Sequence, residues 1–390
     1  MDIKTNNKSI FVLTGGLNYA GGTRVLLNLL KNINSNKYKI HLVLINKTNF
    51  DIRNEISEDI NIIYLNQKIG KLNFIEKMRT VFGFLKLYFA KKPRIILSEN
   101  MNSHILMYIL SIIKFFIPKK FGSYWIARKG TLELGKSFFE KKLYKLVYKM
   151  PNHIVTPSQM VKDIVNKKMN ITENKITKIY NPVDINNIKK KSFKKQRTGI
   201  KHLDDYIDSN GDFILYVGRL MKRKNVDLLV ETAKIAYENR IDIKWVIIGS
   251  GDEYNFLKNK IKKYNLESYI YLTGYIENPY YFMQKASLFI LPSEEEGFGY
   301  VLIEAMLCNC PVIALDTDGG PKEMIEHKYN GILVKFPYTA KKLFESTKSL
   351  LNDKESYNFI KKNGYTYAQK FDIEKITQKY EKVFELFLED

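Results

Sequence analysis

Short apolar runs bounded by turns alternate with longer amphipathic stretches along the chain. The runs expected to form buried strands are 9–14, 40–45, 60–65, 94–98, 123–127 and 153–158 in the first half, and 211–219, 243–249, 269–274, 286–293, 311–316 and 331–334 in the second. Helical patterns such as 24–33 and 226–240 lie between them. Strands that alternate with helices are typical of parallel sheets joined by right-handed crossovers. The pattern therefore predicts an α/β fold.

This α/β pattern stops and restarts once. Residues 185–211 are polar and charged and lack apolar periodicity. A chain of 390 residues also exceeds the usual size of a single core. We therefore expect two doubly wound, Rossmann-like domains, 1–184 and 212–370, which are joined by this linker and face each other across a cleft. The carboxyl ends of parallel strands at such a cleft are where α/β sheets bind ligands.

The charge and the cysteines narrow the classes of partner and the compartment. The chain has 63 Lys+Arg against 41 Asp+Glu, a formal net charge of +22. That excess attracts anionic partners, which include nucleic acid, an acidic membrane surface and phosphorylated ligands. Cys308 and Cys310 are too close in sequence to form a bridge without severe strain, and they lack the spacing of a zinc site. We expect reduced core cysteines, which are compatible with the cytoplasm.

Two apolar stretches are candidates for a signal peptide or a membrane-spanning helix. The N-terminal one is only a few residues long before the first glycines, which predicts a strand and not a signal peptide. The longest apolar run, 105–118, contains Lys114 and falls short of the ~20 residues that a membrane-spanning helix needs. We expect a chain that is soluble or that lies on a membrane without crossing it.

Three strand ends carry residue types that suit a phosphate. Glycines let backbone N–H groups approach a phosphate, and two or more cations at the mouth of a parallel sheet suit a diphosphate. The residues concerned are Gly21 and Gly22 before the first helix, Gly218, Arg219, Lys222, Arg223 and Lys224 after the strand at 211–219, and Gly249 after the strand at 243–249. A tight turn and a solvated basic turn are the alternative interpretations of these segments.

The stretch "SEEEGFGYVLIEAM", 293–306, concentrates negative charge within this basic chain. Glu296 and Glu304 flank the sequence Gly297-Phe298-Gly299. A carboxylate accepts paired hydrogen bonds from vicinal hydroxyls, as dinucleotide-binding folds do with a ribose, and the glycines leave room for a sugar. Paired carboxylates also serve as the acid and nucleophile of glycosidases, but that chemistry does not call for the cations at 219–224. Together with the glycine turn at 319–321, these features predict a nucleoside diphosphate bearing a sugar as the ligand.

At these residues the chain resembles the retaining GT-B glycosyltransferases of family 4, the glycosyl transferases group 1 proteins. The stretches that carry the resemblance are the glycines at 21–22, "VTPSQMVKDIV" (155–165), "KIYNPVD" (178–184), 217–224, "IIGSGDE" (247–253), 291–314 and "GGPKEMI" (319–325). The resemblance implies a GT-B fold with an acceptor-binding first domain and a nucleotide-sugar-binding second domain. It also implies a C-terminal helix, 371–390, that packs back on the first domain.

The resemblance assigns roles to single residues. Arg219 and Lys224 would bind the donor diphosphate and neutralise the charge on the leaving group. Glu296 would lie beside the donor sugar, near the reacting centre, and Glu304 would hold the ribose hydroxyls. The remaining donor-binding positions, in part through their backbone, would be Gly21, Gly22, Gly218, Gly249, Phe298 and Gly299. Such enzymes use no bound metal and no cofactor, because the nucleotide-sugar is itself a substrate.

The acceptor side departs from the family pattern. Arg128 stands where many members have a His, and His104 follows the preceding strand. Both are candidates for the acceptor side, although position alone favours a structural or an exposed His104 as the alternative. Residues 119–149 carry nine Lys/Arg against two Glu with aromatic residues between them. Such a segment fits an anionic membrane interface and a lipid-linked acceptor, or it is a solvated basic face.

The sequence thus predicts a retaining transferase that moves a hexose or N-acetylhexosamine from a nucleotide-sugar, most often UDP-linked in such enzymes. The acceptor would be a glycan or a lipid-linked sugar of a bacterial surface polysaccharide or glycolipid. We expect the enzyme in the cytoplasm, at the inner face of the cell membrane. A nucleotide-sugar epimerase or a sugar-phosphate synthase is the same-fold alternative. A nucleic-acid-binding protein is suggested by charge alone, and no recognition module supports it.

Overall fold

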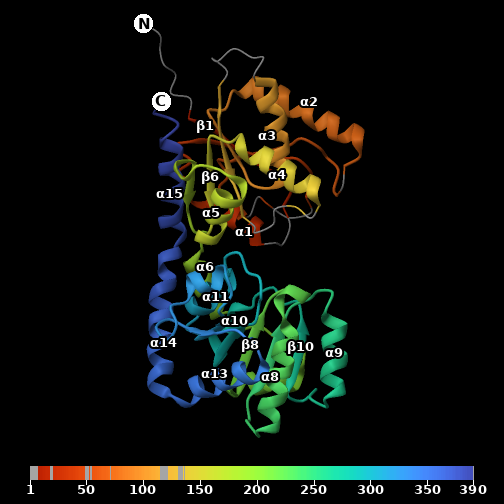
Figure 1. Cartoon of the computed structure of the whole chain (residues 1–390), viewed down its shortest axis with the longest axis vertical. Helices are drawn as coiled ribbons and strands as arrows, with labels where there is room; N and C mark the ends of the chain where they lie inside the picture. Colours follow the sequence, from red (N-terminus) through yellow and green to blue (C-terminus); the bar gives the residue numbers. More distant parts are fainter. Residues whose placement is uncertain are drawn as a thin grey trace. The chain divides into compact units, whose positions relative to one another are not determined.

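The computed structural model describes residues 8–17, 21–48, 52, 55–70, 72–114, 122–130, 135 and 137–389. The chain divides into two compact units, Met1–Val183 with Ile373–Asp390, and Asp184–Asp372 (Figure 1). Each unit contains one sheet in which every neighbouring pair of strands is parallel. The prediction of an α/β fold with two parallel sheets is confirmed.

The first unit has a seven-stranded sheet of order β3-β2-β1-β4-β5-β6-β7. Its strands are β1 (Ser9–Thr14), β2 (Lys39–Leu44), β3 (Asn61–Tyr64), β4 (Ile95–Ser98), β5 (Tyr124–Arg128), β6 (His153–Thr156) and β7 (Ile176–Lys178). The strand order reverses between β1 and β4, which is the arrangement of a doubly wound sheet. The pattern of apolar residues missed only β7, an edge strand of three residues that is too short to show a run.

Helices cover both faces of this sheet. Ile10 and Val12 of β1 pack into one core, whereas Phe11 and Leu13 pack into the other, because successive side chains of a strand point to opposite faces. The first core includes residues of α1 (Gly21–Asn32) and α15 (Ile373–Glu385). The second includes residues of α2 (Phe74–Lys91), α3 (Met101–Lys114) and α4 (Phe138–Lys149). Burial on both faces explains why these strands read as continuous apolar runs.

The segment between β6 and β7 is also helical. Ser158 accepts a hydrogen bond from the backbone N–H of Val161 and so caps α5 (Gln159–Asp163). One π-helical turn (Ile164–Lys168) and one 3₁₀ turn (Glu173–Lys175) follow. The side-chain cap satisfies a backbone donor that the first helical turn leaves unpaired.

The second unit has a six-stranded sheet of order β10-β9-β8-β11-β12-β13. Its strands are β8 (Phe213–Val217), β9 (Lys244–Ile248), β10 (Ile270–Gly274), β11 (Leu288–Leu291), β12 (Val312–Leu315) and β13 (Ile332–Val334). Its helices are α6 (Ile185–Ser192), α7 (Lys201–Asp208), α8 (Val226–Glu238), α9 (Tyr254–Lys263), α10 (Tyr280–Lys285), α11 (Tyr300–Leu307), α12 (Gly320–Met324), α13 (Ala340–Asn352) and α14 (Lys354–Ala368), with short 3₁₀ turns η5 (Lys222–Lys224) and η6 (Gln369–Phe371).

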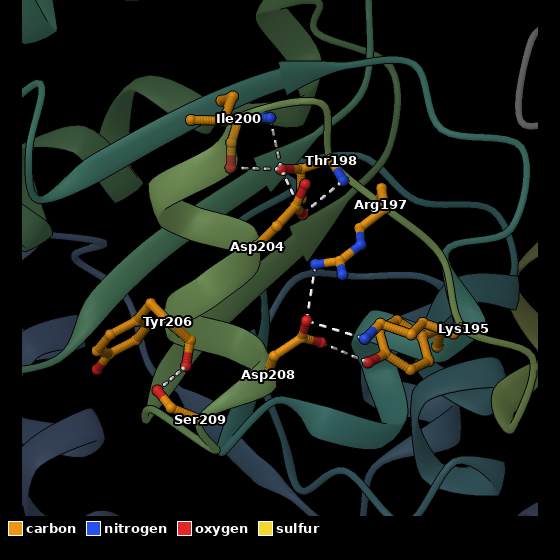
Figure 2. Close-up of polar contacts among 9 residues, drawn as sticks. Lys195, Arg197, Thr198, Ile200, Asp204, Tyr206, Asp208 and Ser209 are labelled. Carbon is orange, nitrogen blue, oxygen red and sulfur yellow. Dashed lines mark hydrogen bonds and ion pairs between the residues drawn. The ribbon is translucent and has the colours of Figure 1, made fainter.

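The segment 185–211, which the sequence assigns to a linker, belongs to the second unit and forms α6 and α7. Asp208 accepts hydrogen bonds from Lys195 Nζ at 2.9 Å and from Arg197 Nη1 at 2.7 Å (Figure 2). Asp204 accepts a hydrogen bond at 2.8 Å from the hydroxyl of Thr198 (Figure 2). The apolar residues that these helices bury are few, Ile188 in α6 and Leu203 and Ile207 in α7, and the polar residues between them explain why the segment resembles a linker in sequence.

The C-terminal residues belong to the first unit. Phe384 of α15 is fully buried, and the centroid of its ring lies 6.1 Å from that of Tyr38 in an edge-to-face arrangement. The carboxylate of Glu381 accepts a hydrogen bond at 2.9 Å from the backbone N–H of Asn34, and Glu385 pairs with Lys37. The last helix therefore completes the core on one face of the first sheet.

Two expectations from composition concern the cysteines and the membrane. Cys308 and Cys310 are both buried and free, as predicted. Burial raises the pKa of each thiol, which keeps both protonated. Within the ranges that the structure describes, no helix is both long and apolar enough to span a bilayer.

Replacing Phe384 with Ala should lower the free energy of unfolding of the first unit by about 3–5 kcal/mol, because it leaves a cavity between α15 and Tyr38. The two tryptophans, Trp125 and Trp245, lie in different units. Urea unfolding followed by fluorescence in a Trp245→Phe background therefore reports the first unit alone. The exposed Lys379→Ala on the same helix is the control. Equal unfolding midpoints for F384A and K379A would contradict this role of α15.

Candidate functional site

The predicted donor residues of the second unit gather at one edge of its sheet. Because β8, β9, β11 and β12 are parallel, their carboxyl ends share this edge. The loops that follow them span 218–225, 249–253, 292–299 and 316–319. These loops contain Arg219, Lys224, Gly249 and Glu296. The sheet thus brings together residues that lie far apart in the sequence.

The loops after β8 and β9 continue the backbone pairing beyond the strands. Gly218 N donates to the carbonyl of Ile248 at 3.0 Å, and Leu220 N donates to the carbonyl of Ser250 at 2.9 Å. The backbones are so close that a Cβ on Gly249 would lie 1.8 Å from the carbonyl oxygen of Gly218. Gly249 also has a φ of +153°. The structure therefore gives Gly249 a packing role at this edge, since only glycine fits.

A cation and a carboxylate meet at this edge. Lys224, at the end of η5, donates a hydrogen bond through Nζ to Oε2 of Glu296, which lies in the loop after β11. The side chains of Lys224 and Glu296 are 16% and 19% exposed, so that both retain access to solvent. Each charge is partly desolvated and faces the other, an arrangement that orients both side chains before any ligand binds.

Backbone contacts fix the loop that carries Glu296. Gly320 N donates to the carbonyl of Glu296 at 2.7 Å. A Cβ on Gly320 would lie 2.2 Å from the carbonyl carbon of Phe298, so glycine permits the close approach of the two loops. On the other side, Asn225 Nδ2 donates to Glu294 at 3.2 Å. The Glu296 loop is therefore held from both sides.

The remaining predicted residues of the second unit differ in exposure. Glu304, in α11, is 5% exposed and accepts a hydrogen bond at 2.9 Å from the hydroxyl of Tyr280. The ring of Phe298 is buried and lies 5.8 Å from that of Phe371. Gly299 adopts a left-handed conformation, with φ +77°, just before α11. The ring of Phe298 thus packs in the core, and only its backbone is available to line a site.

Arg219 is an exposed cation of this edge. Among the described residues, its guanidinium has no ion-pair or hydrogen-bond partner. Its carbonyl accepts a hydrogen bond at 3.1 Å from the hydroxyl of Tyr216. Burial, and to a lesser degree the charge of Glu296, raises the pKa of Tyr216, so this hydroxyl remains a donor. Tyr216 therefore fixes the backbone from which Arg219 extends.

In the first unit, Arg128 belongs to a buried polar network at the carboxyl edge of the sheet. Its guanidinium donates to Glu99 Oε1 at 3.0 Å and to Asn181 Oδ1 at 2.7 Å. Burial raises the pKa of Glu99, and the charge of Arg128 opposes that shift. Asn100 links the network to the end of β1, because its Nδ2 donates to Thr14 Oγ1 at 2.7 Å. The two nitrogens at the tip of Arg128 are thus engaged by protein.

The glycines before the first helix lie at the same edge of the first sheet. Gly21 and Gly22 begin α1. A Cβ on Gly22 would lie 3.2 Å from Oε1 of Glu99, so a side chain there would press on the carboxylate that pairs with Arg128. The described residues therefore place the start of α1 next to the buried ion pair.

His104 does not occupy the acceptor-side position that the sequence suggested. Its side chain is fully buried, with Nδ1 2.7 Å from the hydroxyl of Ser98 and the ring 5.0 Å from that of Tyr148. Burial lowers the pKa of His104 to about 3, so the ring is neutral. A ring enclosed by Tyr148 and Trp125 does not reach an acceptor. The structural role given as the alternative fits this position.

Sequence reasoning missed several members of these networks. Glu99, Asn100 and Asn181 come directly after β4 or shortly after β7, and Tyr216 lies within β8. Polar residues just past a strand end were a usable signal in "SEN" (98–100) and "YNP" (180–182). Tyr216 gave no such signal, because an aromatic residue in a strand is ordinarily a core residue.

No group of three or more His, Cys, Asp and Glu side chains in the described ranges is placed to hold a metal ion.

Comparison with protein families assigns both units. The family described as Glycosyl transferases group 1 matches residues 204–367, and the Glycosyltransferase Family 4 description matches residues 19–187. The chain belongs to the family 4 glycosyltransferases. Together the two family models span most of the chain, and the group 1 model includes Lys224 and Glu296.

Known relatives agree with this assignment. The glycosyltransferase is 29% identical to the Campylobacter jejuni N-acetylgalactosamine-N,N'-diacetylbacillosaminyl-diphospho-undecaprenol 4-alpha-N-acetylgalactosaminyltransferase, over 93% of this chain and 95% of that protein. It is 24% identical to the capsular polysaccharide biosynthesis glycosyltransferase CapM of Staphylococcus aureus, over 80% and 82% of the two chains. The crystal structure of Anabaena HepE in complex with UDP superposes with a TM-score of 0.77 at 18% identity, covering 97% of this chain and all (100%) of that one. The fold is GT-B.

Replacing Gly249 with Ala should lower the free energy of unfolding of the second unit by about 1–3 kcal/mol, because the new Cβ forces the ends of β8 and β9 apart. Fluorescence of Trp245 in a Trp125→Phe background would measure this change during urea unfolding. Ser250→Ala in the same turn is the control, since the side chain of Ser250 is exposed. If G249A and S250A unfold at the same urea concentration, the close approach does not constrain this edge.

Stability of the first unit should fall as the pH drops below about 6.5. The folded state holds the pKa of His104 near 3, well below its ordinary value of 6.5, so only the unfolded chain takes up the proton in this range. For each proton that only the unfolded chain binds, the free energy of unfolding falls by about 1.4 kcal/mol per pH unit. The pKa values of His41 and His153 are lowered too, again mainly by burial. Replacing His104 with Asn should therefore reduce the pH dependence of urea unfolding between pH 6 and 4.5 without abolishing it. An unchanged dependence would show that His104 titrates normally.

Proposed function

We propose that this enzyme is a retaining glycosyltransferase that moves a hexose or N-acetylhexosamine from a UDP-sugar to a lipid-linked or glycan acceptor. The observation that carries the proposal is the contact between Lys224 and Glu296 at the carboxyl edge of the second sheet, beside the exposed Arg219. A cation that suits a phosphate and a carboxylate that suits sugar hydroxyls meet there within one hydrogen bond.

The cations serve the leaving group. Transfer of the sugar leaves a nucleoside diphosphate, whose charge grows as the glycosidic bond breaks. Lys224 and Arg219 neutralise that charge, and fixed cations in a partly desolvated site do so more effectively than water. In this proposal the two side chains do the work that a bound metal does in other transferases, so the reaction needs neither a metal nor a cofactor.

The carboxylates serve the two sugars of the donor. Glu296 lies beside the transferred sugar, and its backbone contact with Gly320 holds it in place. Glu304 binds the ribose hydroxyls, with its carboxylate oriented by the hydroxyl of Tyr280. The acceptor hydroxyl attacks on the face from which the phosphate leaves, and the departing phosphate takes its proton. This geometry retains the anomeric configuration.

The relatives support the choice of substrates. HepE was crystallised with UDP, which supports a uridine nucleotide as the donor. The Campylobacter enzyme acts on a diphospho-undecaprenol sugar and forms an alpha linkage, which supports a lipid-linked acceptor and retention. A lipid-linked acceptor would place the enzyme in the cytoplasm at the inner face of the membrane, in the synthesis of a surface polysaccharide or glycolipid.

The decisive experiment incubates the purified enzyme with single UDP-sugars and an undecaprenyl-diphosphate-linked sugar, and measures UDP release and glycolipid product. The anomeric configuration of the product is read by NMR, and EDTA is added in a parallel reaction. Transfer with retention in EDTA is expected. Inverted product or complete loss in EDTA would overturn the mechanism. A soluble product formed without the lipid acceptor would favour a sugar-phosphate synthase or an epimerase instead.

Arg219→Ala, Lys224→Ala and Glu296→Gln should each lower kcat/KM for transfer by about 10²–10³, because each removes an interaction that strengthens in the transition state. Lys222→Ala is the matched control, since Lys222 is an exposed cation of the same basic turn. Circular dichroism and thermal unfolding establish that each variant is folded. Near-normal turnover in R219A and E296Q would refute the assigned roles.

A further inference from the structure

Helix α4 exposes most of its apolar residues. Among its described side chains only Val147 and Tyr148 are buried. Phe138 and Phe139 are 76% and 81% exposed, and Leu143 and Leu146 are also exposed. A helix that covers a sheet ordinarily turns its apolar stripe inward. In α4 a second apolar surface faces solvent instead.

Helix α2 shows the same arrangement, which the sequence pattern did not single out. Thr80, Phe84 and Tyr88 are its buried residues. The large apolar residues that it exposes are Phe74 (77%), Ile75 (62%), Met78 (42%), Phe82 (64%) and Phe89 (37%). Single exposed apolar residues are common on protein surfaces, but a row of them along one helix marks an interaction site.

The two helices lie on the same side of the first unit. Phe84 and Tyr88 of α2 and Val147 and Tyr148 of α4 pack into one core together with residues of α3. All three helices therefore cover one face of the sheet, as Figure 1 shows. Ile112 of α3 is 48% exposed on the same layer. The outward sides of α2, α3 and α4 thus belong to one layer of the first unit, and they are called the apolar–basic face below.

Cations accompany the apolar residues on this face. Helix α2 contains Lys77, Arg79, Lys86 and Lys91 with one acidic residue, Glu76, and α4 contains Lys141, Lys142, Lys145 and Lys149 with one acidic residue, Glu140. Both glutamates are engaged in capping boxes, in which their carboxylates accept from the backbone N–H of Asn73 and Ser137. The acidic groups are thus tied to the helix starts, while the cations are exposed.

We propose that the apolar–basic face docks on an anionic lipid bilayer, with α2 and α4 both inserting aromatic side chains at the interface. Phenylalanines at the headgroup level bury apolar area, and lysines beside them attract lipid phosphates. Two helices fix the orientation of the first unit on the membrane, which one helix does not. The purpose of this docking in the cell rests on the proposed lipid-linked acceptor, whereas the binding of the face to a bilayer does not.

Charge decides between a bilayer and a second copy of the chain. A symmetric dimer through this face would place the lysines of one copy against those of the other. Each helix carries four cations against one acidic residue, so two such faces repel. An anionic bilayer supplies the opposite charge to the same groups.

The test is flotation of the purified full-length protein with vesicles of phosphatidylcholine, with and without 30% phosphatidylglycerol, in the absence of any nucleotide-sugar. We expect binding that requires the anionic lipid. The double variants Phe74→Ser/Phe82→Ser in α2 and Phe138→Ser/Phe139→Ser in α4 should each lower the partition coefficient by at least about tenfold. The matched control is Phe193→Ser/Phe336→Ser, since these residues are 70% and 77% exposed in the second unit.

Binding of the α2 variant equal to wild type, or binding indifferent to phosphatidylglycerol, would overturn the proposal. A concentration-dependent dimer in sedimentation, lost in the same variants while vesicle binding is unchanged, would assign the face to a second copy. Transfer to a water-soluble short-chain acceptor separates this proposal from the catalytic one. The α2 variant should keep that activity, whereas failure of the proposed function would abolish it in the wild type and leave flotation intact.

Discussion

Parallel pairing of strands is the constraint on which the rest of this enzyme depends. It forces every strand of a sheet to end at one edge, where the loops carry the groups that are not needed for packing. In the second unit the pairing continues past the strands, from Gly218 to Ile248 and from Gly320 to Glu296. Lys224 and Glu296 lie far apart in the sequence, and this backbone frame is what brings them into contact.

The two units treat charge at their sheet edges differently. In the first, Arg128 and Glu99 are almost completely enclosed, with side chains 5% and 9% exposed, and Asn181 takes a further donor of the guanidinium. A buried pair of this kind is costly to break, and it orders the ends of several strands. In the second, Lys224 and Glu296 keep some contact with solvent, and Arg219 is exposed. A ligand can compete for the solvent-accessible charges of the second unit, but it cannot easily compete for the buried pair of Arg128 and Glu99.

The outer surface of the first unit differs from both sheet edges, because it exposes apolar side chains. Its helices α2 and α4 bury one narrow stripe in the core and leave several other large apolar side chains exposed. Such a surface is unfavourable in water and favourable at an interface that is both apolar and anionic. The proposed catalytic groups in the second unit and the proposed interfacial surface on the first would suit an enzyme that joins a water-soluble donor to a membrane-bound acceptor.

The sequence by itself determined the α/β class, the two parallel sheets and nearly every strand, because buried parallel strands leave continuous apolar runs between turns. It also determined the positions of the glycines, cations and carboxylates at the strand ends. The tertiary structure decided the burial of His104, the pairing of Arg128 with Glu99 and Asn181, and the membership of 185–211 in the second unit. Each of these depends on contacts between residues distant in sequence, and no local pattern records which partner a side chain meets when the chain folds.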